Sequence, residues 1–65
     1  MDFQSQIKVI NAGFIIIRCD DSPNPRIKVK GDAVCEWRTL EKFDSKAARD
    51  RRFKELLKEP SYISD

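Results

Sequence analysis

The fold of this chain is decided by residues 37–57, which read WRTLEKFDSKAARDRRFKELL. The segment begins as an extended stretch at Trp37 and changes at Phe43-Asp44-Ser45 to the capping chemistry of a helix start. Asp44 or Ser45 can accept hydrogen bonds from the free amides of the first turn, and Phe43 can pack back onto the helix. We therefore expect a strand that leads directly into a helix.

The predicted helix runs from about residue 45 to residue 58 and stops before Pro60, which cannot continue it. Phe53, Leu56 and Leu57 share one face at the helical spacing of 100° per residue. We expect this face to pack on a sheet. The remaining residues are predicted to form a short tail over 60–65.

Four strands are predicted before the helix, at about residues 6–10, 14–19, 26–30 and 33–40. Phe14 and the three isoleucines after it fit a pleated sheet better than a helix. The strict alternation of RIKVK, residues 26–30, places apolar side chains on one face and cations on the other. The expected fold class is α+β: a three- or four-stranded antiparallel β-meander packed against one C-terminal helix, as a single domain over residues 1–65.

The composition is that of a small folded chain. Hydrophobic residues make up 40% of the 65 residues, which argues against a disordered chain. At this size roughly 60% of the unfolded surface is buried on folding, so a second copy or a partner could add stability. The net charge of +2 excludes a polycation that coats nucleic acid regardless of its fold.

Neither catalysis nor cofactor binding is expected from this sequence. The chain has no histidine, and Cys19 and Cys35 lack the CxxC spacing of a zinc site. The sequence shows no pair of carboxylates on two rigid elements and no nucleophile beside a base. We therefore predict no enzyme activity, no metal and no small-molecule substrate. Buried thiols are favoured over a disulfide between the two cysteines, and a cytoplasmic protein without a signal peptide or membrane span is expected.

A cationic stripe is predicted on the outer face of two neighbouring strands. Its members are Arg26, Lys28, Lys30 and Arg38. Their spacing suits the phosphates of a nucleic acid, and a two-stranded ribbon of this kind can also lie in a major groove. The competing interpretation is an ordinary solvated strand face, because edge strands carry lysine partly to prevent aggregation.

The second face of the sheet needs its own cover. One helix shields one face only, yet the segment from Phe14 to Ile17 is apolar on both. Phe3, Tyr62 and Ile63 could fold over the second face from the chain ends. Alternatively, Phe14 and Ile16 form a binding surface for a second copy or another protein, since uncovered apolar patches usually mark contacts.

Arg49 is unusual because it lies on the core-facing side of the predicted helix. One hypothesis is that its stem packs on Trp37 or Phe43 while the guanidinium binds strand carbonyls or Glu36. The other is an anion contact. Asp50 is adjacent in sequence and is not expected to pair with Arg49 directly.

Strands are followed in this chain by Trp37, by Phe43-Asp44-Ser45 and by a helix that begins Lys46-Ala47-Ala48. In this order of features the chain resembles two groups of small DNA-binding domains. These are the domains of plant AP2-type factors and the N-terminal arms of some phage integrases. The resemblance covers residues 14–57 and implies that the sheet enters the major groove with the helix behind it. It carries over to Arg26, Lys28 and Arg38 as contacts, whereas residues 14–17 replace the Arg- and Gly-rich motif of the AP2-type first strand.

Overall fold

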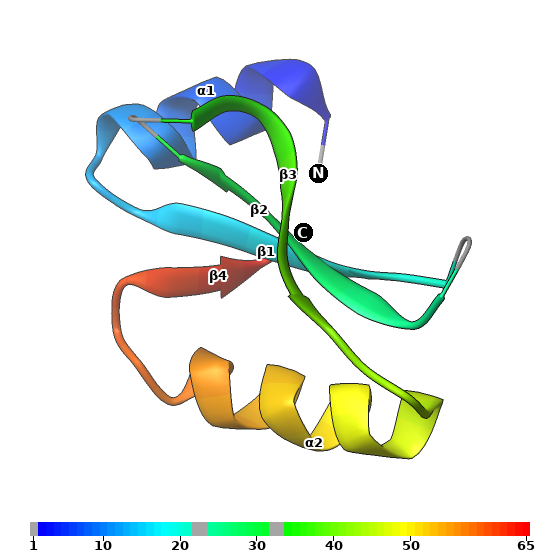
Figure 1. The fold of residues 1–65 in the computed structure, drawn as a ribbon. Helices are drawn as coiled ribbons and strands as arrows, with labels where there is room; N and C mark the ends of the chain where they lie inside the picture. The colour runs from blue at the N-terminus through cyan, green and yellow to red at the C-terminus, as the bar shows by residue number, and fades with distance from the viewer. Residues whose placement is uncertain (1, 22–23, 32–33) are drawn as a thin grey trace.

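The chain forms three layers, a mixed sheet between two helices (Figure 1). The computed structural model describes residues 2–21, 24–31 and 34–65, with only the backbone of residues 34 and 35. The elements follow the order α1 (Phe3–Asn11), β1 (Ile15–Asp20), β2 (Arg26–Gly31), β3 (Val34–Lys42), α2 (Lys46–Leu57) and β4 (Tyr62–Ser64). The predicted α+β class is confirmed, and the helix predicted at the C-terminal side is α2.

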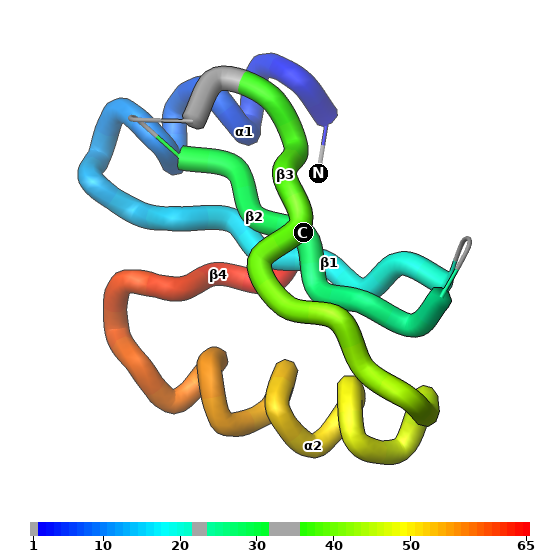
Figure 2. Tube along the Cα trace, in the orientation of Figure 1, coloured from blue at the N-terminus to red at the C-terminus, as the bar shows by residue number. Residues whose placement is uncertain are grey.

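The sheet has the strand order β3-β2-β1-β4. Strands β1, β2 and β3 are the predicted antiparallel meander, and the tail adds β4 parallel to β1, with Ile15 opposite Tyr62. Figure 2 shows how β3 passes from the side of α1 to the start of α2. Residues 32 and 33, where a turn and the start of the third strand were predicted, lie outside the described residues.

The prediction of a strand at residues 6–10 is wrong, because these residues belong to helix α1. Asp2 caps the helix, because its carboxylate accepts a hydrogen bond from the Ser5 amide at 2.7 Å. At the other end Gly13 has a φ of 97°, a conformation that glycine adopts without strain. The amides of Gly13 and Phe14 donate to helix carbonyls at 3.0 and 3.2 Å, which is the pattern of a glycine-terminated helix.

The core on the α2 side of the sheet is built from residues that the sequence pattern places on one face. Ile17 and Ile27 are fully buried, and Leu56 of α2 is 7% exposed. Partly buried apolar side chains surround them: Val29, Phe43, Phe53 and Tyr62. Helix α2 packs against β1, β2 and β4, so the predicted apolar face of the helix covers this side of the sheet.

Ile16 is also fully buried, although it points away from Ile17. Helix α1 packs against β1 on the face opposite α2 (Figure 1). The expectation that Ile16 lies on an uncovered face is therefore wrong, because the N-terminal segment folds as a helix over it. Phe14, the other predicted contact residue, stays 37% exposed.

We expect Ile16→Val and Ile17→Val each to lower the free energy of unfolding by about 1 kcal/mol, because each removes a buried methylene. Ile7→Val, at a side chain that is 40% exposed on α1, should cost clearly less. Urea denaturation followed by circular dichroism measures all three. If Ile16→Val costs no more than Ile7→Val, α1 does not cover β1.

Candidate nucleic-acid interface

The face of the sheet that carries α1 also carries a group of cations. Lys28 and Lys30 alternate with the core residues of β2 and project to this side. Arg18 of β1 lies opposite Lys28 in the strand register, so it projects to the same side. Arg26 joins them at the end of β2, with its Nη1 3.5 Å from Thr39 Oγ1 and its Nε donating to the Asn24 carbonyl at 3.2 Å.

Two aromatic rings stand among these cations. The Cζ atom of Arg18 lies 4.2 Å from the centre of the Trp37 ring, a stacked cation–π contact. The Nζ atom of Lys30 lies 5.0 Å from the centre of the Phe3 ring and 6.0 Å from that of Trp37. Phe3 comes from α1 and Trp37 from β3, so Lys30 bridges the two aromatic residues.

The cations also have acidic and amide partners within the chain. Lys28 Nζ lies 3.4 Å from Asp20 Oδ2, and Arg18 Nη1 lies 3.8 Å from Asp65 Oδ2. Gln6 Nε2 donates to Asp65 Oδ1 at 3.1 Å, and Gln6 Oε1 accepts from Lys30 Nζ at the same distance. The network positions Arg18 and Lys30 around Trp37.

These ion pairs are too weak to close the surface to an external anion. The side chains of Lys28 and Asp20 are 26% and 31% exposed, and that of Arg18 is 42% exposed. Partly exposed pairs of this kind contribute about 0.2–1 kcal/mol and weaken with salt. A phosphate group can therefore replace Asp20 at Lys28 at low cost.

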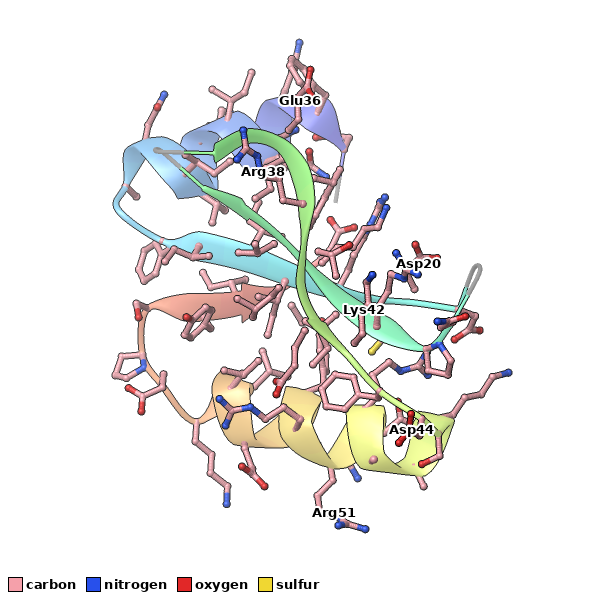
Figure 3. All side chains as sticks on the ribbon, viewed as in Figure 1. Asp20, Glu36, Arg38, Lys42, Asp44 and Arg51 are labelled. Carbon is pink, nitrogen blue, oxygen red and sulfur yellow. The ribbon has the colours of Figure 1, made fainter. Side chains whose placement is uncertain are left out.

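The four residues of the predicted cationic stripe do not all lie on one face of the sheet. Arg26, Lys28 and Lys30 lie together, but Arg38 follows Trp37 directly in β3 and so projects to the other side of that strand. Figure 3 shows Arg38 across β3 from Asp20, the partner of Lys28. The prediction that Arg38 belongs to the stripe is wrong, because its neighbour Trp37 occupies the cationic side.

Three members of the site were missed by the sequence analysis: Arg18, Trp37 and Phe3. The register of the β1 strand was open, so Arg18 could not be assigned to a face. Trp37 was considered as a packing partner of Arg49 rather than as a site residue, and Phe3 lay outside any predicted helix. The one available signal was the pairing of the first and second strands, which places Arg18 beside Lys28.

Arg49 is a structural residue that joins α2 to the end of β1. Its side chain is 8% exposed, and Nη1 donates to the Asp20 carbonyl at 3.2 Å and to the Asp21 carboxylate. Nε and Nη2 donate to Asp50 Oδ1 at 3.1 and 3.0 Å. The expected carbonyl contact is thus confirmed, whereas the expectation that Asp50 does not pair with it is wrong.

Glu36 is not the partner of Arg49, contrary to one of the predictions. It lies on the part of β3 near α1, whereas Arg49 belongs to α2 on the opposite face of the sheet (Figure 3). The guanidinium is engaged by Asp20, Asp21 and Asp50, so an external anion has no advantage there. The hydrogen bond from Arg49 lowers the pKa of Asp21 and in turn raises the pKa of Arg49.

Cys19 carries a free thiol and is exposed, so the expectation of a buried thiol is wrong at this position. The desolvation that neighbouring groups still impose on this thiol raises its pKa, so the reactive thiolate is disfavoured. The side chain of Cys35 lies outside the described part of the structure, so the predicted state of that thiol is not addressed.

Neither a metal site nor a membrane-spanning helix is found among the described residues. Among the described side chains, no group of three or more Cys, Asp and Glu residues is placed so that it could hold a metal ion. No helix in that same part of the chain is both long enough and apolar enough to cross a membrane.

Comparison of the chain with protein-family models, with curated proteins and with solved structures finds no match. The resemblance to AP2-type and integrase-arm domains therefore stays a prediction. The geometry of the cationic face is therefore the only basis for proposing a function.

The Arg49–Asp21 contact predicts a specific acid dependence of stability. Because the pKa of Asp21 is lower in the folded state than in the unfolded state, its contribution to stability is complete above the unfolded value of about 3.8. It is lost as the pH falls through the lower, folded-state pKa. Asp21→Asn should therefore lose less stability than the wild-type chain between neutral pH and this acid range, as measured by urea denaturation at stepped pH.

Glu36→Gln is the matched control, since Glu36 is an exposed acid remote from Arg49. This variant should keep the acid dependence of the wild type. An Asp21→Asn profile that is parallel to the wild-type profile throughout would contradict the assigned role of Arg49.

Proposed function

We propose that the chain is a small, non-enzymatic nucleic-acid-binding module. The observation that carries the proposal is the gathering of Arg18, Arg26, Lys28 and Lys30 on one face of the sheet, with Arg18 and Lys30 beside the Trp37 ring. Such a surface offers positive charge to phosphates and an aromatic ring to bases. A cytoplasmic location remains our expectation.

The local charge favours an anionic polymer over a single small anion. Among the described residues, the carboxylates of Asp20 and Asp65 pair with Lys28 and Arg18 on this face, while Arg26 and Lys30 add further positive charge to it. The cations are spread along β1 and β2 and do not converge on one point. A chain of phosphates can contact several of them in succession.

Binding should weaken steeply with salt, because each phosphate that is neutralised releases counterions. We expect Lys28→Gln to reduce the slope of log affinity against log salt concentration by about 1, the loss of one phosphate contact. Fluorescence anisotropy of a labelled oligonucleotide, titrated at several salt concentrations, measures this slope for the wild type and the variant.

Two variants make the test specific. Lys54→Gln removes an exposed cation of α2, on the opposite side of the sheet, and should leave the slope unchanged. Asp20→Asn removes the internal partner of Lys28 and should raise affinity. The proposal is sunk if Lys54→Gln weakens binding as much as Lys28→Gln, or if the wild type binds no nucleic acid at low salt.

A contact with a second copy or another protein is the second candidate. It is favoured by the exposed apolar side chains of Ile7 and Phe14, which are 40% and 37% exposed. The buried Ile16 no longer belongs to such a surface. A dimer that forms independently of the salt concentration and does not bind nucleic acid would favour this candidate over the first.

A further inference from the structure

The exposure of Phe3 is the feature of the cationic face that phosphate binding does not explain. Its side chain is 65% exposed, more than the other large apolar side chains found exposed in the described part of the chain. Phe3 is the first residue of helix α1, and the Lys30 ammonium lies 5.0 Å from the centre of its ring. A solvent-facing aromatic ring beside a cation is suited to stacking on a flat ligand group.

Trp37 offers a second place for stacking. The Arg18 guanidinium lies over its ring, and the guanidinium is itself planar. A base can stack on the exposed guanidinium or take its place on the indole ring. Lys30 lies between Phe3 and Trp37, so a phosphate held by Lys30 would have an aromatic ring on either side.

Helix α1 makes this face unsuitable for the major groove of a duplex. The helix stands on the same side of the sheet as Lys28 and Lys30, and an α-helix with side chains is about 10–12 Å across. The major groove, about 12 Å wide, admits one helix or a two-stranded ribbon. The β2–β3 ribbon with a helix standing beside its cations exceeds that space.

We propose that this face binds an unpaired nucleic-acid strand, with bases stacked on Phe3 and on the Trp37–Arg18 pair and phosphates at Lys28 and Lys30. The inference rests on the nucleic-acid-binding function proposed above and adds the strand state of the ligand. The duplex is disfavoured twice, since its bases are already stacked and α1 blocks approach to its groove.

The single tryptophan of the chain provides a direct probe of this contact. Oligothymidylate, oligouridylate and a duplex of the same length are titrated into the intact protein at one salt concentration while Trp37 fluorescence is recorded. We expect the single strands to quench the fluorescence and to bind at least about tenfold more tightly than the duplex. The two single strands distinguish DNA from RNA as the source of the unpaired bases.

Phe3→Leu tests the stacking contact on a residue outside the core. The variant keeps an apolar side chain but removes the aromatic ring, and it should weaken single-strand binding by about fivefold to a hundredfold. Ile7→Ala, one helical turn further along α1 and 40% exposed, is the matched control and should leave binding unchanged.

The possible outcomes separate this inference from the proposed function. Equal affinity for single strands and duplex, or equal effects of Phe3→Leu and Ile7→Ala, overturns the unpaired-strand inference and leaves nucleic-acid binding in place. Binding to none of the three oligonucleotides at low salt overturns both.

Discussion

The burial of β1 on both of its faces is the constraint on which the rest of the structure depends. Ile16 and Ile17 are adjacent, point to opposite sides and are both fully buried. One helix cannot satisfy both, so the chain places α2 over Ile17 and α1 over Ile16. Each fully buried isoleucine contributes about 1.5–3 kcal/mol of transfer free energy, a large amount for a domain of this size.

The same constraint positions the candidate site. Because α1 must cover Ile16, it brings Phe3 and Gln6 to the face where Arg18, Lys28 and Lys30 project. Without α1 these cations would form the plain cationic ribbon that the alternation of β2 suggests. With α1 beside them they form a surface with an aromatic ring on each side of Lys30.

Much of the fold was accessible from the sequence where local chemistry is strong. Ser45 caps α2 by accepting from the Ala48 amide at 3.2 Å, and the helix ends before Pro60, as predicted. Helix α1 was missed because its β-branched residues favour a strand by propensity, and the need to cover Ile16 overrides that preference. Its caps, Asp2 and Gly13, were the signals that could have identified it.

The candidate site was less predictable, because it depends on which side chains of neighbouring strands project to the same face of the sheet. The alternation within β2 correctly grouped Arg26, Lys28 and Lys30. The face on which Arg38 lies is decided by the register between β2 and β3, which pairs Arg38 with Val29. A methyl-resolved NOE spectrum would test the two-sided burial of β1 most directly. It should connect the methyl groups of Ile17 to Leu56 of α2 and those of Ile16 to protons of α1. Contacts of both isoleucines to α2, or none from Ile16 to α1, would contradict the three-layer account.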